Sequence, residues 1–164
     1  MKLHENKRLF ADAIQAASRP TKDGGLGIKS IFIEKDYWIC RSLALMSKND
    51  INGRAIFKGG TSLTKAYGIG SRFSEDIDIA IAEAWNLKGN QLKNLIKKTS
   101  KGMTEGLQEM IIPGVTSKGS HYHKAFYTYP RAVEEPQIGA IKAGQLLVEI
   151  NSFANPFPFE KCKL

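Results

Sequence analysis

The sequence predicts an α+β fold, a mixed β-sheet flanked by helices. Apolar residues recur at the spacing of an amphipathic helix in three segments, residues 4–18, 31–48 and 91–108. Polar and apolar residues alternate, as in half-buried strands, in three other segments, residues 76–81, 122–129 and 145–151. With 164 residues, of which 42% are hydrophobic and 24% charged, the chain is long enough to bury a core. We expect one domain over residues 1–164.

The first two helices are expected to precede the first strand. The first helix ends before Pro20, and a loop with three glycines over residues 21–30 leads into the second. The second would pack on the sheet through one stripe, made of Ile33, Tyr37, Cys40, Ala44 and Leu45. In that orientation Glu34, Lys35 and Asp36 face outward or pair locally, and we expect no chemistry from them.

The helix over residues 91–108 carries an unusual number of lysines opposite its apolar stripe. They are Lys93, Lys97, Lys98 and Lys101. One interpretation is a solvated charged face, and the other is a track for the phosphate backbone of RNA. The formal net charge of +8 and the pI near 9.5 favour a polyanionic partner such as RNA or a nucleotide.

The rest of the chain is organised around residues 57–81, which read FKGGTSLTKAYGIGSRFSEDIDIAI. A strand over residues 54–58 stops at Gly59 and Gly60, and glycines there let the backbone turn tightly and approach a ligand. A helix capped by Thr61 or Ser62 is expected to follow, and its first N–H groups would suit a phosphate. A glycine pair alone is more often an ordinary turn.

The strand over residues 76–81 carries two carboxylates. Asp76 and Asp78 are two residues apart, so they point to the same face while the isoleucines between them face the core. Two neighbouring carboxylates repel each other unless a cation lies between them, and oxygen ligands favour magnesium completed by phosphate oxygens. A lone pair of this kind is more often a solvated face. A phosphate turn followed at once by such a pair indicates a nucleotidyltransferase site.

A third acidic residue, Glu149, lies between Val148 and Ile150 in a strand that should be central. An isolated charge in a core is very unfavourable, so the carboxylate needs a partner. That partner could be a metal ion shared with the aspartates, or an ion pair, for example with Lys142 or Arg131.

These motifs resemble the signature of the AbiEii/AbiGii-type nucleotidyltransferase toxins, a branch of the polymerase-beta-like superfamily. The matching residues are the turn Gly59, Gly60, Thr61 and Ser62, the pair Asp76 and Asp78, and the third carboxylate Glu149. The segments IEKDYW over residues 33–38 and RFSE over residues 72–75 also resemble this branch. The resemblance extends over residues 30–157.

The resemblance implies a minimal nucleotidyltransferase fold that moves a nucleoside monophosphate from an NTP to a hydroxyl of RNA, with tRNA as the acceptor in relatives. Asp76, Asp78 and Glu149 would hold Mg²⁺ or Mn²⁺ for an in-line displacement in which pyrophosphate leaves. The four-residue turn would bind the NTP phosphates. Lys65 either reaches a phosphate oxygen or faces solvent, and Arg72 either contacts the nucleotide or pairs with Glu75.

The resemblance also implies a toxin of a toxin–antitoxin or abortive-infection system with a cognate antitoxin. Relatives continue past the third carboxylate into a helical region, for which this sequence has no counterpart, so we expect exposed apolar surface and a homo-oligomer or a partner. The alternative expectation is a catalytically inactive remnant that binds nucleotide or RNA. A metal-dependent nuclease and a transferase with a small-molecule acceptor are further alternatives.

The remaining sequence features favour a cytoplasmic protein. No apolar run is long enough to cross a membrane, and the first ten residues are charged without a following apolar signal segment. The two cysteines, Cys40 and Cys162, are far apart and in no metal-ligand spacing. Cys40 is expected to be a small core residue.

Overall fold

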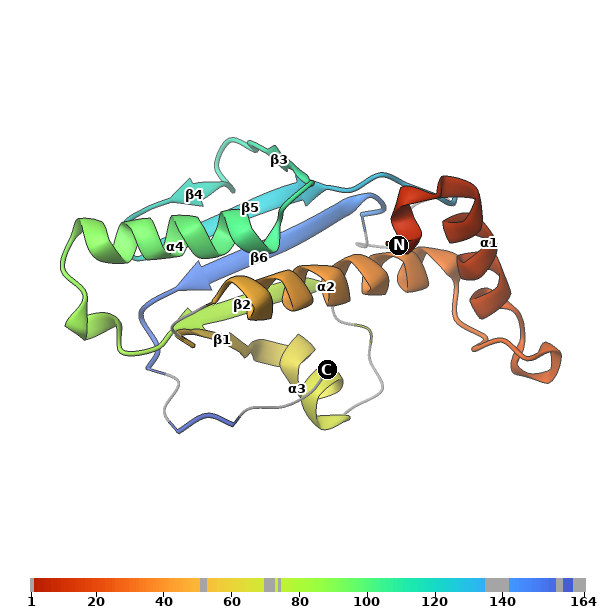
Figure 1. Cartoon of the computed structure of the whole chain (residues 1–164), viewed down its shortest axis with the longest axis horizontal. Coiled ribbons are helices and arrows are strands. Elements are labelled where there is room, and N and C mark those ends of the chain that lie inside the picture. The colour runs from red at the N-terminus through yellow and green to blue at the C-terminus, as the bar shows by residue number, and fades with distance from the viewer. Residues whose placement is uncertain are drawn as a thin grey trace.

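The computed structural model describes residues 2–50, 53–69, 73, 75–134, 142–155 and 158–160. In this part of the chain it contains four α-helices and a sheet of six strands (Figure 1). The helices are α1 (Lys7–Ser18), α2 (Ser30–Asn49), α3 (Gly59–Tyr67) and α4 (Asn90–Met103). The strands are β1 (Ala55–Lys58), β2 (Asp76–Ile81), β3 (Gln108–Met110), β4 (Ser117–Lys118), β5 (Tyr122–Thr128) and β6 (Gln145–Asn151). Short 3-10 turns are η1 (Leu3–Glu5), η2 (Thr21–Asp23) and η3 (Ala84–Asn86).

The sheet is mixed, which confirms the predicted fold class. The strand order is β1-β2-β6-β5-β3, and β4 pairs with β5. Strands β2 and β6 are parallel, whereas the other neighbouring pairs are antiparallel. The parallel pairing places Asp78 directly opposite Glu149, so two of the predicted carboxylates become neighbours although 71 positions (149 − 78) separate them in the sequence.

The two faces of the sheet have different environments. One face is fully buried by the helices and carries the alternating apolar residues Ile77, Ile79, Ala125, Leu146, Val148 and Ile150. Helices α2 and α4 lie along this face, and both contact the sheet (Figure 1). Because side chains alternate along a strand, residues of the other parity, such as Asp78 and Glu149, point to the opposite face. We call this second side the carboxylate face.

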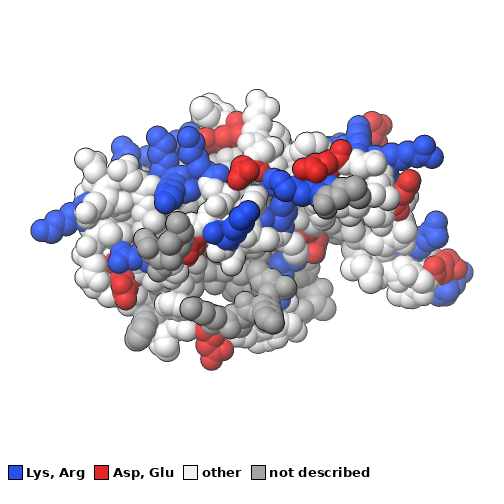
Figure 2. Space-filling model, in the orientation of Figure 1, with Lys and Arg blue, Asp and Glu red and all other residues white. Residues whose placement is uncertain are grey.

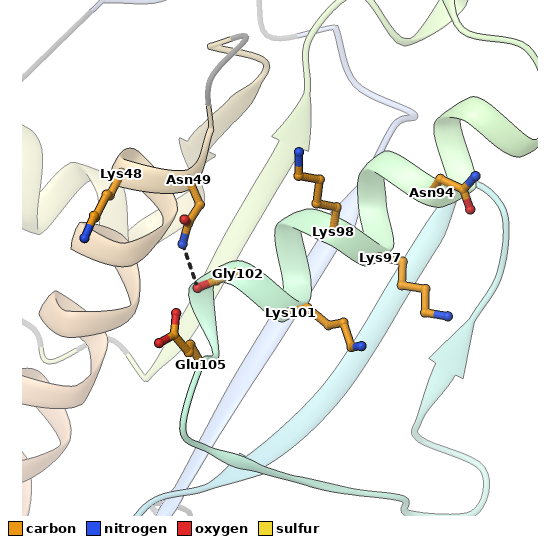
Figure 3. Close-up of a pocket in the computed structure, with 8 residues that line it drawn as sticks. All are labelled: Lys48, Asn49, Asn94, Lys97, Lys98, Lys101, Gly102 and Glu105. Atoms are coloured by element: carbon orange, nitrogen blue, oxygen red, sulfur yellow. Dashed lines mark hydrogen bonds between the residues drawn. The ribbon is translucent and has the colours of Figure 1, made fainter.

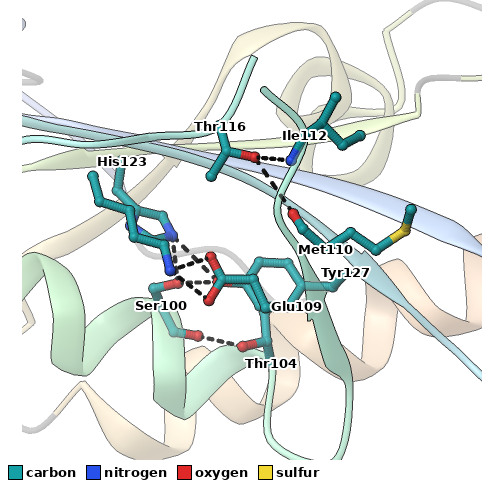
Figure 4. Close-up of polar contacts among 9 residues, drawn as sticks. Ser100, Thr104, Glu109, Met110, Ile112, Thr116, His123 and Tyr127 are labelled. Carbon is teal, nitrogen blue, oxygen red and sulfur yellow. Dashed lines mark hydrogen bonds and ion pairs between the residues drawn. The ribbon is translucent and has the colours of Figure 1, made fainter. Parts of the chain in front are cut away.

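A buried polar cluster joins α4 to β5 (Figure 4). The Ser100 hydroxyl lies 2.7 Å from the Tyr127 hydroxyl and 3.1 Å from Nε2 of His123. Burial lowers the pKa of His123, so the neutral imidazole is favoured there. The buried position of His123 indicates a structural role.

The predicted stripe of α2 was wrong by about one residue. The buried side chains of this helix include Ile31, Lys35, Trp38, Ile39, Leu43 and Met46, whereas Cys40 and Ala44 are exposed. Glu34 and Lys35 are therefore buried, not outward-facing, and Cys40 is not a core residue. Trp38 sets which side of α2 faces the sheet, because its ring stacks on that of Tyr129 with 5.4 Å between the ring centroids.

Two other predicted boundaries also differ from the structure. Helix α4 ends at Met103, and Gln108, which was predicted to be helical, begins β3 instead. Helix α3 begins at Gly59, with Lys58 at the N-cap position, so neither Thr61 nor Ser62 caps it. A strand predicted to begin within residues 138–143 falls mostly outside the described residues.

Candidate active site

The glycine turn and the carboxylate strand touch at the start of α3. Gly59 has a φ of +76°, a left-handed conformation that favours glycine. A Cβ at this position would overlap the Asp78 carboxylate and would lie 3.1 Å from its Cβ and Cγ. The Thr61 hydroxyl donates a hydrogen bond of 2.6 Å to the main-chain carbonyl of Asp76. The predicted phosphate turn is thus held against both aspartates.

A row of four charged residues crosses the carboxylate face. The strand register places Lys58 of β1 opposite Asp78 of β2, Asp78 opposite Glu149 of β6, and Glu149 opposite Lys124 of β5. The two acids lie in the middle, and a lysine lies at each end. The two acids were predicted from the sequence, but the two lysines were not, because only the pairing of distant strands places all four residues in one row.

Asp76 and Asp78 are in an environment that disfavours their charged forms. The pKa of Asp76 is raised by burial and by the carboxylates of Glu75, Asp78 and Glu149, against the opposing effect of Lys35. The pKa of Asp78 is raised by burial and by Glu149, and Lys58 and Lys124 oppose this. Burial and neighbouring carboxylates thus both raise the pKa values of the pair, and a bound cation would oppose this effect.

Glu149 is held by two neighbours on β5. Its Oε1 lies 2.5 Å from Nζ of Lys124, and its Oε2 accepts a hydrogen bond of 2.9 Å from the Tyr122 hydroxyl. Burial pushes the pKa of Glu149 up, but the bonds from Lys124 and Tyr122 outweigh burial and the pKa is lowered. Glu149 thus forms the ion pair that was one of the two predicted possibilities. Its partner is Lys124, whereas Lys142 and Arg131 were the predicted examples. The ammonium of Lys142 instead lies 5.7 Å from the centre of the Phe126 ring.

Lys35, from which no chemistry was expected, pairs with Glu75 beside the first aspartate. The Lys35 side chain is only 4% exposed, and its Nζ lies 2.8 Å from Oε2 of Glu75, the residue before Asp76. A buried lysine of α2 therefore places a positive charge beside the first aspartate. The apolar residues Ile31, Ile39 and Leu43 follow the same four-residue spacing as Lys35, but this spacing alone does not reveal its partner.

The predicted nucleotide-binding residues do not all converge on the carboxylates. Lys65 turns toward α2, where its Nζ lies 2.6 Å from Oδ1 of Asp36 and 3.2 Å from Sγ of Cys40. Burial lowers the pKa of Lys65, but the pairing with Asp36 and Cys40 outweighs burial and the pKa is raised. The Ser62 hydroxyl donates to the Gly59 carbonyl at 2.8 Å. Arg72 lies outside the described residues.

The aspartate pair has the donor chemistry that magnesium requires. Asp76 and Asp78 offer carboxylate oxygens two residues apart, and magnesium in proteins is commonly held by one or two carboxylates plus substrate phosphates. Within the described residues, no three His, Cys, Asp or Glu side chains already form a metal-binding group. Asp76 and Asp78 therefore fit the ion, whereas each carboxylate oxygen of Glu149 already has a partner, Lys124 or Tyr122.

Opposite changes are expected in the pKa of Asp76 when its two charged neighbours are removed. Lys35→Met should raise this pKa, because Lys35 lowers it, and Glu75→Gln should lower it, because Glu75 raises it. Lys35→Met should also destabilise the protein by about 1.5–3 kcal/mol through the lost charged hydrogen bond. An NMR titration of the Asp76 carboxyl would measure the shifts. Lys65→Met is the matched control, and an equal shift there would contradict the assignment of Lys35.

A glycine turn packed against a pair of strand carboxylates is the layout of a nucleotidyltransferase-type site. The chain belongs to the AbiEii family, described as nucleotidyl transferase AbiEii toxins of type IV toxin–antitoxin systems, whose family model matches residues 41–164. The predicted resemblance is thereby confirmed. No curated protein and no solved structure matches the chain. Across the described residues, no helix has the length and apolarity that crossing a membrane requires.

Proposed function

We propose that this protein transfers a nucleoside monophosphate from an NTP to a hydroxyl of RNA, with tRNA as the expected acceptor. It would act as the toxin of its system, with a cognate antitoxin as a partner. The observation that carries the proposal is the contact of Gly59 with the Asp78 carboxylate. It supports the proposal because a turn suited to phosphate and a pair of carboxylates suited to magnesium would then form one site.

The residues of the site have separate roles in this proposal. The N–H groups at the start of α3 would bind phosphate oxygens of the NTP, helped by the positive end of the helix dipole. Asp76 and Asp78 would hold magnesium on the triphosphate. Bound magnesium neutralises phosphate charge and lowers the pKa of an attacking hydroxyl. Lys124 and Tyr122 would keep Glu149 ionised opposite Asp78 in the strand register.

A transfer assay tests the proposal. The protein would be incubated with each labelled NTP, magnesium and total tRNA, beside the double variant Asp76→Ala/Asp78→Ala. We expect label on RNA with the wild-type protein alone. No label with any NTP, from a folded protein that still binds magnesium–NTP, would contradict transfer and support the inactive remnant. Shortened RNA would instead indicate a nuclease.

A further inference from the structure

A groove lined by lysines lies between α2 and α4 (Figure 3). Its volume is about 500 Å³. Its lining residues are Lys48, Asn49, Asn94, Lys97, Lys98, Lys101, Gly102 and Glu105. The four lysines against one glutamate give the lining a net charge of +3 (4 − 1). Figure 2 shows Lys and Arg side chains gathered over the part of this face where α4 lies.

The groove is built rigidly where the two helices meet. The Asn49 amide donates a hydrogen bond of 3.2 Å to the Gly102 carbonyl (Figure 3), and a Cβ at Gly102 would lie 3.2 Å from that of Asn49. Arg41 donates a second hydrogen bond of 2.8 Å to the Glu105 carbonyl. These contacts fix the end of α2 against the end of α4, so the lysines stand on a preformed surface.

The lysines of α4 include like-charged neighbours, although Lys101 in the last turn is favoured by the helix dipole. Lys93, Lys97 and Lys101 follow each other at intervals of four residues, so like charges are neighbours on one side of the helix. Lys93 lies in the first turn, where the helix dipole is unfavourable for a cation, and that turn has no acidic residue. Within the described residues, none of these three lysines, nor Lys98, is in an ion pair. The repulsion between these exposed lysines, which outnumber Glu105 in the lining, would be relieved by an external polyanion.

The lining chemistry fits a phosphate backbone better than a protein surface. The groove has no aromatic or large aliphatic side chain, and such anchors dominate protein interfaces, where lysine is depleted. Lysine ammonium groups and asparagine amides are donors to phosphate oxygens, and they read no base sequence. We propose that this groove binds the phosphodiester backbone of RNA without sequence preference.

The groove lies on the opposite side of the sheet from the carboxylates. Helix α4 packs on the face of His123 and Tyr127, because Ser100 contacts both (Figure 4). Lys124, of the other parity on β5, points to the carboxylate face and pairs with Glu149. A groove on the helix side cannot hold the reacting end of an acceptor. The groove would hold the body of a large RNA whose end reaches the carboxylates. This part of the inference rests on the proposed function.

Direct RNA binding tests the inference without any transfer step. Fluorescence anisotropy with a labelled tRNA and a labelled poly(U) strand would be measured with EDTA and without NTP, over a series of salt concentrations. The variant Lys97→Gln/Lys98→Gln/Lys101→Gln should bind both RNAs at least roughly 10-fold more weakly, and its slope of log affinity against log salt should be shallower by about 2–3. The matched control is Lys7→Gln/Lys22→Gln/Lys29→Gln, which removes the same charge from exposed lysines of other segments.

The outcomes separate this inference from the proposed transfer. If both triple variants weakened RNA binding equally, or if neither weakened it, the groove would not be an RNA site. The inference would also be overturned if the wild-type protein bound poly-L-glutamate and the groove variant kept its affinity for RNA. The occupant of the groove would then be an acidic polypeptide. Asp76→Ala/Asp78→Ala should leave RNA binding intact while it stops transfer. In an active enzyme the groove variant should raise KM for tRNA, with kcat and transfer to a trinucleotide acceptor unchanged.

Discussion

Replacement of Asp78 by Asn is expected to abolish nucleotidyl transfer and to stabilise the metal-free protein at neutral pH. The loss of activity should exceed the roughly 10- to 100-fold that follows from losing an outer-shell partner of a metal ligand, because Asp78 would be a ligand itself. The gain in stability follows from the raised pKa of Asp78, since burial and Glu149 disfavour its charged form. Active sites often contain such unfavourable groups, and removing them stabilises the fold.

The pH dependence of this stabilisation has a definite sign. A carboxyl whose pKa is raised by folding binds its proton more tightly in the folded chain, so the free energy of unfolding decreases as pH rises through the window above the ordinary value of 3.8. Asn does not titrate, so the variant lacks this decrease. The difference in unfolding free energy between variant and wild type should be small below pH 3.8 and should grow until pH exceeds the raised pKa.

Urea unfolding at several pH values, with and without magnesium, would measure both effects. Magnesium should stabilise the wild-type protein, because an ion that binds only the folded state adds to the free energy of unfolding, and it should not stabilise Asp78→Asn. The variant Asp36→Asn is the control, since Asp36 of α2 pairs with Lys65 of α3. If Asp78→Asn lost stability at neutral pH, or kept its response to magnesium, the carboxylate pair would not be a cation site.

The sequence could predict much of the sheet and the carboxylate pair because both depend on local alternation. Strand β6 begins and ends at the predicted residues, Gln145 and Asn151, and β2 places Asp76 and Asp78 on one face as expected. The side-chain period of a strand is two, so the pattern fixes which residues share a face. Identifying Glu149 as their neighbour needed the family resemblance in addition.

The predictions that failed depend on contacts between distant segments. When the buried stripe of a helix includes polar residues, the sequence does not show clearly which side faces the sheet. Lys35 was predicted on the wrong side of α2 because its partner, Glu75, is 40 residues away. Lys124 could not be linked to Glu149 without the antiparallel register of β5 and β6. The direction of Lys65 is likewise set by Asp36 of another helix. Contacts between distant segments set the positions of all three lysines, and these contacts cannot be predicted from local residue spacing.

Gly59→Ala should impair both the fold and the proposed reaction, for two separable reasons. The left-handed φ of +76° disfavours any residue with a Cβ, which should destabilise the protein by about 1–2 kcal/mol. The added methyl group would also overlap the Asp78 carboxylate and displace it. Because a displacement of about 1 Å can reduce a rate by about 100-fold, we expect a transfer defect of that order.

Gly68→Ala separates the two effects of this substitution. Gly68, at the C-cap of α3, has a similar φ of +64°, but a Cβ there would meet no atom within 4 Å. It should therefore show a comparable loss of unfolding free energy with transfer activity retained. Chemical denaturation and the tRNA transfer assay, run on both variants below their melting temperatures, give the comparison. Equal activity of the two variants would show that the glycine turn serves the backbone alone, and that close packing against Asp78 has no part in the chemistry.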